Sequence, residues 1–442
     1  MDKFYYIFTF GCQMNVHESE KLAGILEKRG YKKTKHAQDA EVMVFNTCCI
    51  RGSAEQRILG NIGAVKPLKR KNKDIIVAVC GCMSQQKGMA DQLKEKFPFI
   101  DIIFGANNVE FFENYLDEFI EKKKYTKQVL ESEFYMENSL KVPVVRDNKY
   151  YAYVNIMYGC NNFCTYCIVP YVRGREKSRR PEEIYAEVKN LLNSGYKVIT
   201  LLGQNVNSYG SDGSTDGVNF ATLLDTIANF EGDFEVRFLT SHPKDLSDEL
   251  IDVMARNDKI SKVLHLPVQA GSNSVLKAMN RKYTVEHYRD LIKKLKDRMP
   301  NIILSTDIIV GFPNESEEDF AETEKLLTDI RFNNAFIFIY SKRKGTVAEK
   351  LPNQIPLSVK HTRIYKLLGI QREINGQLFN AMVGTTVRVL VDGGENGSYT
   401  AKTQCGKFTK IYQDPSKPLE VGNFYDCEIY DYKNGNLIGR VN

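Results

Sequence analysis

Three cysteines lie within eight consecutive residues near the middle of the chain, at Cys160, Cys164 and Cys167 (the central cysteines). Thiolates are the usual ligands of iron–sulfur clusters, and this spacing lets one loop wrap one face of a cubane cluster. Three local ligands leave one iron open for a small molecule. A zinc site would need a fourth cysteine or histidine close by, and the nearest histidine along the chain is His242. The spacing therefore favours an iron–sulfur cluster over zinc or inert buried thiols.

Three more cysteines each follow a predicted strand, at intervals of about one strand–helix unit. These strand-end cysteines are Cys12, Cys48 and Cys82. Because the carboxyl ends of parallel strands meet at one edge of a sheet, we expect these thiols to converge on a second cluster with an open iron. Cys82 is preferred to Cys80 because Gly81 ends the apolar strand before it, whereas spacing alone leaves both Cys48 and Cys49 open.

The composition is that of an ordinary globular protein. The chain has 442 residues, of which 43% are hydrophobic and 26% charged, and at roughly 150 residues per domain we expect about three domains. No apolar run approaches the ~18 residues of a membrane helix, and the N-terminus lacks signal-peptide features, so we expect a cytoplasmic protein with no membrane partner. In that reducing compartment, ten cysteines indicate metal binding or catalysis rather than disulfides. Cys405 and Cys427 have no partner at a metal-ligand spacing and are expected to be ordinary residues.

Strands alternate with helices over residues 1–120, which predicts an α/β domain built on a doubly wound parallel sheet. The predicted strands are Phe4–Gly11, Val42–Thr47, Ile75–Val79 and Ile102–Gly105. One helix is expected over Val16–Gly30, and another runs from the second strand to about Lys71. Residues Glu121–Lys141 are charged and lack an apolar period, so we expect a linker over 121–145.

A second series of strands and helices spans residues 146–376. The predicted strands are Tyr151–Tyr158, Val198–Leu202, Glu235–Thr240, Val263–Val268, Ile302–Val310 and Ala335–Tyr340. Helices are expected between them, for example over Pro181–Gly195 and Leu246–Asn257, with a last helix over Ser358–Gly376. Six such units with right-handed crossovers predict a (β/α)6 partial barrel, shorter than the closed eight-unit form.

Residues 377–442 are expected to form a small β-barrel. The predicted strands are Thr386–Val391, Ser398–Thr403, Phe424–Tyr430 and Asn436–Val441. Basic and acidic residues are equal in number here, so nucleic-acid binding would need an uneven placement of charge. The candidates for phosphate contacts are Lys402, Lys407 and Lys410. The candidates for stacking on unpaired bases are Tyr399, Phe408 and Tyr412, and core packing is the alternative for each.

The pattern Cys-x3-Cys-x2-Cys, with Tyr166 before the last cysteine, resembles the signature of the radical S-adenosylmethionine superfamily, and the six-unit barrel fits that superfamily. With an N-terminal three-cysteine domain and a C-terminal module similar to the TRAM domain, the whole chain resembles the methylthiotransferases of that superfamily, in particular their tRNA-modifying MiaB branch. The strings that carry this resemblance are Thr9–Asn15 (TFGCQMN), Leu201–Asn207 (LLGQNVN), His265–Ser272 (HLPVQAGS), Met279–Thr284 (MNRKYT) and Ile339–Ser341 (IYS).

The resemblance implies a transferase that adds a methylthio group to C2 of N(6)-isopentenyladenosine at position 37, in the anticodon loop of tRNA. It implies two 4Fe-4S clusters. One, on the central cysteines, binds S-adenosylmethionine and generates a 5′-deoxyadenosyl radical. The other, an auxiliary cluster on the strand-end cysteines, supplies sulfur, and a second S-adenosylmethionine supplies the methyl group. The expected partners are tRNA and a flavodoxin- or ferredoxin-type electron donor, and the enzyme is expected to be a monomer. Radical chemistry suits this target because an aromatic C–H has no acidic proton for a side-chain base.

Polar residues at the predicted strand ends would face the same mouth as the central cysteines. Gly203, Gln204 and Asn205 end the second barrel strand, where this superfamily binds the methionyl amino group. The usual Gly-Gly-Glu of the superfamily reads Leu-Gly-Gln here, so a carboxylate is missing. The remaining candidates for S-adenosylmethionine contacts are Tyr166, Ser241, Gln269 and Asp307, and a purely structural hydrogen bond is the alternative for each polar side chain.

The segment Arg173–Arg180 directly follows the central cysteines and holds five basic residues and one acidic residue. We expect it to contact tRNA phosphates beside the active site, the alternative being a solvated face before the next helix. Reaching C2 of a loop adenosine requires turning that base into a pocket, which is cheaper in a single-stranded loop than in a duplex.

The sequence also leaves three alternative functions open. Sister branches of the family methylthiolate a threonylcarbamoyl adenosine in tRNA or an aspartate of a ribosomal protein, and Gln13–Asn15 with His265–Gln269 favour the isopentenyladenosine branch. A non-enzymatic iron–sulfur electron carrier would hold each cluster with four cysteines, so two sets of three argue against it. An RNA-binding protein with structural zinc is the third alternative.

Overall fold

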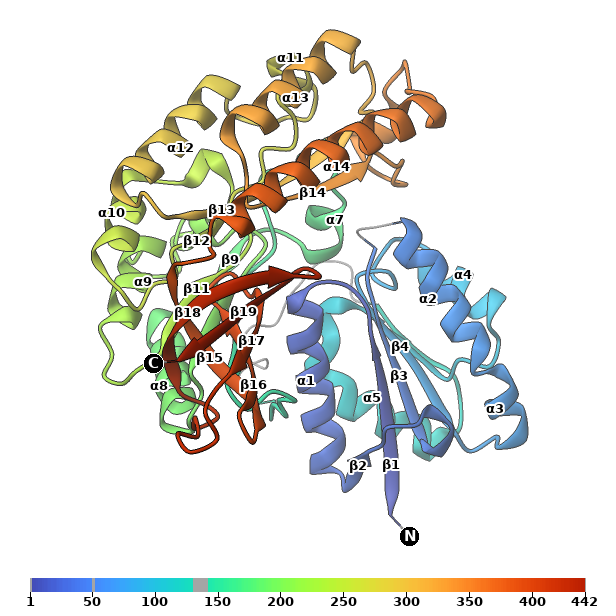
Figure 1. Cartoon of the computed structure of the whole chain (residues 1–442). Helices are drawn as coiled ribbons and strands as arrows, with labels where there is room; N and C mark the ends of the chain where they lie inside the picture. Colours follow the sequence, from blue (N-terminus) through green and yellow to red (C-terminus); the bar gives the residue numbers. More distant parts are fainter. Residues whose placement is uncertain (1, 50–51, 130–141, 442) are drawn as a thin grey trace.

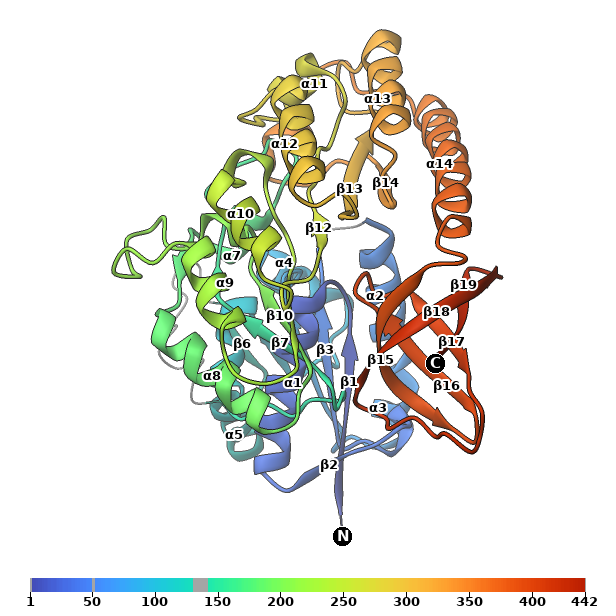
Figure 2. The same cartoon turned by 60° about the vertical axis from the view of Figure 1, so that its left-hand side comes forward.

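The computed structural model describes residues 2–49, 52–129 and 142–441. An N-terminal α/β domain, a central partial barrel and a C-terminal closed barrel lie against one another (Figure 1). Turning the molecule shows the C-terminal barrel below the end of the last helix, α14 (Leu357–Asn380) (Figure 2). The fold class predicted from the sequence is confirmed. Within the described part of the chain, no helix is long and apolar enough to cross a membrane.

The N-terminal domain is a six-stranded parallel sheet with helices on both faces. Its strand order is β2-β1-β3-β4-β5-β6, and the two central strands β3 and β4 are buried along their whole length. The strands are β1 (Lys3–Thr9), β2 (Tyr31–Lys33), β3 (Val42–Thr47), β4 (Ile76–Gly81), β5 (Ile102–Phe104) and β6 (Thr126–Gln128). The helices are α1 (Gln13–Lys28), α2 (Gly52–Ala64), α3 (Lys66–Lys71), α4 (Met89–Lys96) and α5 (Phe112–Lys122), with 3-10 turns η1 (Ala37–Asp39) and η2 (Ala106–Phe111).

Two details of this domain differ from the sequence predictions. The helix expected after the second strand is two helices, because the chain breaks at Val65 and Pro67 stands in the first turn of α3. Strand β6 lies in the stretch expected as a linker, and its residues Thr-Lys-Gln carry no apolar signal. Residues 130–141 of that linker lie outside the described residues.

The central barrel has the six predicted strands in sequence order. Two parallel sheets, β11-β10-β7 and β12-β13-β14, are joined by an isolated bridge between Val236 and Ile260, and the series does not close. The strands are β7 (Tyr151–Asn155), β10 (Val198–Leu202), β11 (Glu235–Phe238), β12 (Val263–His265), β13 (Ile303–Val310) and β14 (Asn334–Ile339), with a small ribbon of β8 (Met157–Tyr158) and β9 (Lys177–Ser178). The helices are α7 (Val169–Arg173), α8 (Pro181–Asn193), α9 (Phe220–Ala228), α10 (Asp248–Arg256), α11 (Asn273–Ala278), α12 (Val285–Arg298), α13 (Glu317–Ile330) and α14 (Leu357–Asn380), with turns η3 (Val206–Ser208), η4 (Pro243–Asp245) and η5 (Val347–Lys350).

The C-terminal barrel is closed, with the strand order β15-β16-β17-β19-β18. Its strands are β15 (Thr386–Glu395), β16 (Ser398–Thr403), β17 (Phe408–Tyr412), β18 (Phe424–Lys433) and β19 (Asn436–Val441). Strand β17 was not predicted, although its alternation of exposed and buried residues is regular. Val389, Tyr399 and Ile411 fill the core, so of the two roles expected for Tyr399 the structure shows core packing and not base stacking.

Candidate active site

The central cysteines lie in the loop between β8 and α7. Cys160 and Cys164 are each 9% exposed. The loop is held by hydrogen bonds from the backbone N–H of Cys160 to the Gly174 carbonyl (3.1 Å) and of Cys167 to the Cys164 carbonyl (2.9 Å). Phe163 has a left-handed backbone (φ 45°), and its carbonyl accepts a hydrogen bond from the Asn280 side chain at 3.0 Å. The turn between the first and second central cysteine is therefore fixed from outside.

The three central thiols influence one another electrostatically. Burial, Glu176 and Cys164 raise the pKa of Cys160 to about 11, and burial and Cys164 raise the pKa of Cys167 to about 12. The Cys160 and Cys167 thiols therefore stay protonated at neutral pH in the metal-free protein. Binding of an iron–sulfur cluster would displace the protons, as thiolate ligation of metals does generally.

Arg281 lies beside the second central cysteine. Its side chain is buried, and one guanidinium nitrogen lies 3.5 Å from the Cys164 Sγ. It also donates to the Pro267 carbonyl (2.7 Å) and to the Tyr283 hydroxyl (2.8 Å), which fixes its direction. Arg281 belongs to Met279–Thr284, one of the strings that carry the family resemblance, but no role was predicted for it. The signal was a lone arginine within that string.

Unsatisfied polar atoms gather at the ends of β10 and β11, where contacts to S-adenosylmethionine were predicted. The Gln204 Oε1, Asn205 Oδ1 and Ser241 Oγ atoms are buried, and the described residues give them no hydrogen-bond partner. The amide nitrogen of Asn205 donates to Asp245 (2.7 Å), so its oxygen points elsewhere. At Gly203, an added Cβ would come within 2.5 Å of the Met157 side chain, so the glycine permits close packing there. Orphaned polar atoms at strand ends fit a polar ligand.

The other predicted cofactor contacts lie on neighbouring elements. Tyr166 is packed edge-on against Phe312, with ring centroids 6.5 Å apart. Gln269 is buried with a left-handed backbone (φ 73°), and its N–H donates to the Asp307 carbonyl at 2.9 Å. The Asp307 carboxylate lies 3.6 Å from the His265 ring. The ring contact of Tyr166 with Phe312 and the contact of Asp307 with His265 therefore fit the structural alternative for these two residues.

The strand-end cysteines follow three adjacent strands. Cys12 precedes α1 after β1, Cys48 follows β3, and Cys82 follows β4. A Cβ added at Gly11 would lie 3.0 Å from the Cys48 Sγ, so the segment carrying Cys12 passes directly over Cys48. Cys12 and Cys82 interact electrostatically with each other. The topology therefore brings these thiols to one edge of the sheet, which is what parallel strands predict.

The two competing cysteines have different surroundings. Cys80 is fully buried within β4, on the face of the sheet covered by α1 and α5, and burial raises its pKa well above the ordinary value. Cys49 lies among apolar residues on the opposite face and donates a hydrogen bond to Cys82. This hydrogen bond and the Arg173 guanidinium lower the pKa of Cys82 despite its burial, which favours a thiolate.

Gly81 positions Cys82. Its φ is +100°, and an added Cβ would lie 2.3 Å from the Thr47 carbonyl oxygen. We expect Gly81→Ala to lower the free energy of unfolding by well over 1 kcal/mol, because backbone strain and a collision with backbone combine. Gly88→Ala is the matched control, since φ is +75° there and nothing lies within 4 Å. Denaturant unfolding of both variants checks this, and equal losses would contradict it.

Neither set of thiols forms a site for a single ion. Among the described residues, no three cysteine, histidine, aspartate or glutamate side chains lie close enough together to hold one metal ion. A cubane cluster takes its thiolates on separate irons, so its ligands are spaced more widely. Buried thiols on rigid loops, cationic neighbours at Cys82 and Cys164, and orphaned polar atoms nearby fit two such clusters and an S-adenosylmethionine site.

Part of the basic segment is buried rather than available to phosphates. Arg173 is 4% and Arg179 5% exposed. Arg173 forms an ion pair with Glu18 of α1, and Arg179 pairs with Glu187 at 2.8 Å. These two arginines correct the expectation that the whole segment binds phosphate. The remaining basic side chains of the segment are exposed, namely Arg175, Lys177 and Arg180.

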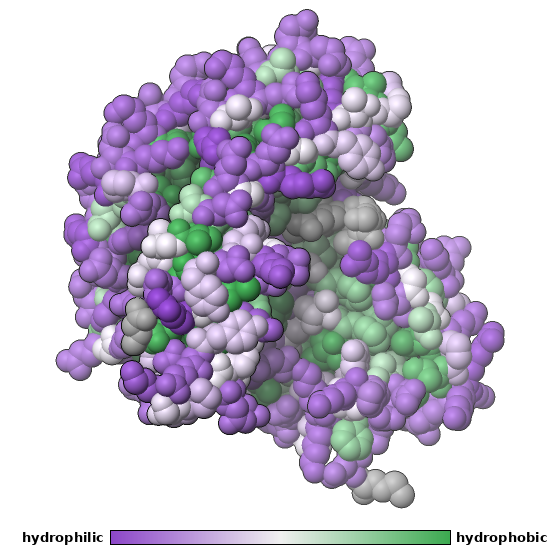
Figure 3. All heavy atoms as spheres, viewed as in Figure 1, coloured by the Kyte–Doolittle hydropathy of each residue, from purple (hydrophilic) through white to green (hydrophobic). Residues whose placement is uncertain are grey.

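A cavity of about 630 Å³ lies between the three parts of the molecule. Tyr153, Thr200 and Arg237 line it from the inner face of the central barrel, whereas their neighbours in sequence pack outward against helices. Gln13, next to Cys12, and Lys402 of the C-terminal barrel line its other walls. Seen from outside, the surface is hollowed between the N-terminal domain and the rest, and apolar side chains gather at that hollow (Figure 3).

The fold and the cysteine loop are those of a radical S-adenosylmethionine enzyme. The family model described as the radical SAM superfamily matches residues 154–327, and the one described as uncharacterized protein family UPF0004 matches residues 4–105. The radical S-adenosylmethionine methyltransferase TsrM from Kitasatospora setae is similar in structure, with a TM-score of 0.58, 12% identity, and 79% of this chain and 74% of that chain covered. The radical enzyme OxsB has a TM-score of 0.52 and 13% identity, covering 85% and 56%. At such identities the likeness shows the shared fold alone.

Curated relatives give the family. A tRNA-2-methylthio-N(6)-dimethylallyladenosine synthase of Clostridium botulinum (strain Langeland) is 48% identical over 439 residues, which is 98% of this chain and 96% of the relative. The enzyme of the same name from Thermoanaerobacter sp. (strain X514) is 48% identical over 441 residues, or 99% and 92%. The chain belongs to the tRNA-2-methylthio-N(6)-dimethylallyladenosine synthase family. The resemblance drawn from the sequence is thereby confirmed.

Proposed function

We propose that this protein adds a methylthio group to C2 of N(6)-isopentenyladenosine at position 37 of tRNA, with the central cysteines and the strand-end cysteines each holding a 4Fe-4S cluster. When bound, the clusters and S-adenosylmethionine supply the 5′-deoxyadenosyl radical, the sulfur and the methyl group. The observation that carries the proposal is the meeting of the two cysteine sets. Arg173, on the helix that follows Cys167, donates a hydrogen bond to Cys82 at 3.2 Å. Both sets can therefore serve one nucleotide.

The protein's own task is to orient the reactants and to keep water away from the radical. Orphaned atoms of Gln204, Asn205 and Ser241 supply hydrogen bonds for S-adenosylmethionine at the barrel mouth. The N-terminal domain covers the open side of the partial barrel there, where Gln204 donates to the Met14 sulfur at 2.7 Å. A flavodoxin- or ferredoxin-type protein supplies electrons to a monomeric enzyme, which works in the cytoplasm where its tRNA substrate is.

The test compares substrates on the reconstituted enzyme. Unmodified tRNA, tRNA with isopentenyladenosine and tRNA with threonylcarbamoyl adenosine are each incubated with S-adenosylmethionine and dithionite. We expect a methylthio product from the isopentenylated tRNA alone. If the product forms from the threonylcarbamoyl substrate instead, or if a ribosomal protein is methylthiolated, the proposed substrate is wrong and the protein has the activity of a sister branch.

One face of the C-terminal barrel is suited to contact the tRNA. Phe408, Lys410 and Tyr412 alternate along β17 on its exposed side, and the Lys410 ammonium lies 5.6 Å from the Tyr412 ring centroid. Aromatic rings beside a cation favour unpaired bases and backbone phosphate. The other two candidate lysines are already engaged. Lys402 pairs with an aspartate, and Lys407 lies over a phenylalanine ring.

We expect Tyr412→Ala to weaken tRNA binding about tenfold, because stacking on a base is worth about 1–3 kcal/mol. Fluorescence anisotropy with labelled tRNA at one fixed salt concentration measures the dissociation constant. Tyr365→Ala on α14 removes another exposed tyrosine, 67% exposed, and serves as the control. Equal dissociation constants for wild type and Tyr412→Ala would show that this face does not stack on the tRNA.

A further inference from the structure

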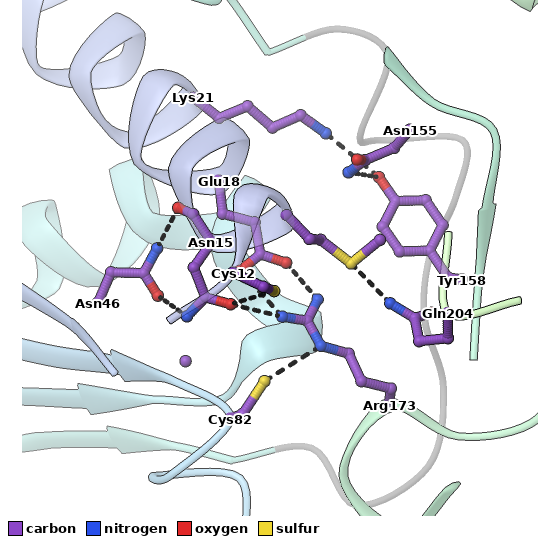
Figure 4. A network of polar contacts seen from close by, with 12 residues as sticks. Cys12, Asn15, Glu18, Lys21, Asn46, Cys82, Asn155, Tyr158, Arg173 and Gln204 are labelled. Atoms are coloured by element: carbon purple, nitrogen blue, oxygen red, sulfur yellow. Dashed lines mark hydrogen bonds and ion pairs between the residues drawn. The ribbon is translucent and has the colours of Figure 1, made fainter. Parts of the chain in front are cut away.

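One arginine connects the two cysteine sets. Arg173 is the last residue of α7, a helix that begins two residues after Cys167. Its guanidinium crosses to the N-terminal domain, where Nε lies 3.2 Å from the Cys82 Sγ and Nη2 lies 3.3 Å from the Asn15 side-chain oxygen. It also forms an ion pair with Glu18 (Figure 4). The contact thus joins the loop of one set to a ligand position of the other.

The surroundings make this contact rigid and electrostatically strong. The side chains of Arg173 and Glu18 are 3% and 4% exposed, so water does not screen their charges. Asn15 is itself held by hydrogen bonds to the Phe10 carbonyl (2.9 Å) and the Thr47 carbonyl (3.0 Å). A guanidinium is planar and permanently charged, so its donors stay fixed once two of them are engaged.

Other contacts cross the same boundary without touching a cysteine. The Lys21 ammonium of α1 lies 3.4 Å from the Tyr158 hydroxyl, and Gln204 reaches Met14 (Figure 4). These contacts hold α1 against the central barrel. The N-terminal domain therefore does not depend on Arg173 alone for its contact with the central barrel. Holding the two together does not explain why the guanidinium lies on the Cys82 sulfur.

We propose that Arg173 is a positioning residue that acts through Cys82 to set the reduction potential of the auxiliary cluster. Hydrogen bonds and positive charge at a ligating sulfur stabilise the more negative, reduced state of a cluster and so raise its potential. The inference rests on the proposed function, because it requires Cys82 to be a cluster ligand. Glu18 keeps the guanidinium in place, and α7 ties it to the central cysteines.

The experiment isolates the auxiliary cluster. In full-length protein carrying Cys160→Ala, Cys164→Ala and Cys167→Ala, the reconstituted auxiliary cluster is titrated with reductant and followed by electron paramagnetic resonance. Adding Arg173→Gln is expected to move the midpoint potential to a more negative value, and Arg173→Lys, which keeps the charge, to move it less. Arg298→Gln removes an exposed arginine that pairs with Asp252 at 2.9 Å, and we expect no shift.

A second variant guards against misfolding. Arg173→Gln alone leaves Glu18 buried without its partner, so the double variant Arg173→Gln with Glu18→Gln removes both charges together. Its elution on size exclusion is expected to match that of the parent, and its potential is expected to be more negative. Unchanged potentials in the Arg173 variants, or an equal shift in Arg298→Gln, would overturn this inference alone. Failure of the parent triple variant to hold a cluster would overturn the proposed function instead.

Discussion

Replacing all three central cysteines with alanine is expected to abolish cleavage of S-adenosylmethionine while the protein still binds tRNA. The reason is chemical, since the proposed function makes cleavage depend on the cluster that these three cysteines would hold. Bound iron should fall from about eight to about four atoms per chain, because one of two 4Fe-4S clusters is lost. The assays are 5′-deoxyadenosine release under dithionite and iron content after reconstitution.

The control for this experiment removes a cysteine outside both sets. Cys405 lies in the C-terminal barrel, where its sulfur is 3.0 Å from the Thr403 hydroxyl, so Cys405→Ala is expected to cleave at the wild-type rate. Cleavage at the wild-type rate in the triple variant would contradict the assignment of the central cysteines.

Replacing the strand-end cysteines is expected to have the complementary effect. Cleavage of S-adenosylmethionine continues, but the methylthio product falls below detection because the sulfur-supplying cluster is absent. A comparison of the single variants Cys48→Ala and Cys49→Ala tests which of these two cysteines is a cluster ligand. Cys48 lies against Gly11 beside Cys12, whereas Cys49 faces the apolar core and Cys82.

We therefore expect Cys48→Ala to lose the auxiliary cluster and the product, and Cys49→Ala to retain both. Mass spectrometry of the tRNA product and iron analysis of each variant decide between the two residues. Loss of product in Cys49→Ala with full activity in Cys48→Ala would exchange their roles. If Cys12→Ala still thiolates tRNA, the auxiliary site lies elsewhere.

Long apolar strands and the cysteines that follow them could be predicted from the sequence. All six strands of the central barrel were expected, because each is an apolar run between turn signals and amphipathic helices. The short strands β2, β6 and β17 could not be. Strands β2 and β6 are three residues long and mostly polar, and in β17 the buried positions are Thr409 and Ile411 whereas its aromatic residues are exposed, so apolar and buried positions do not coincide. The limits of the domains at residues 120, 145 and 376 stay predictions.

The partners of buried charges were the part of the site that the sequence did not reveal. Arg173 lies in a run of basic residues that reads as a phosphate-binding surface, yet its ionic partner Glu18 is 155 positions away in the chain. Nothing in a local pattern marks that pairing. The same holds for Arg281, which approaches Cys164 from a distant loop. The cysteines differ because their spacing is itself the signal.

Aromatic residues of the C-terminal barrel show a similar limit. Tyr399, Phe408 and Tyr412 were equivalent candidates for base stacking, because composition does not tell which side of a strand faces the core. The structure buries Tyr399 and leaves Phe408 and Tyr412 38% and 45% exposed. Their difference arises because successive residues of a strand face opposite sides of the sheet, and Tyr399 stands at a core-facing position of β16 whereas Phe408 and Tyr412 stand at outward-facing positions of β17.

The most direct test of the central claim is mass spectrometry of tRNA nucleosides from cells that lack this gene, compared with the complemented strain. We predict that 2-methylthio-N(6)-isopentenyladenosine disappears from the deletion strain, that N(6)-isopentenyladenosine accumulates, and that the gene restores the product. An unchanged level of the methylthio nucleoside in the deletion strain, with loss of a methylthio group from a threonylcarbamoyl nucleoside or a ribosomal aspartate, would contradict it.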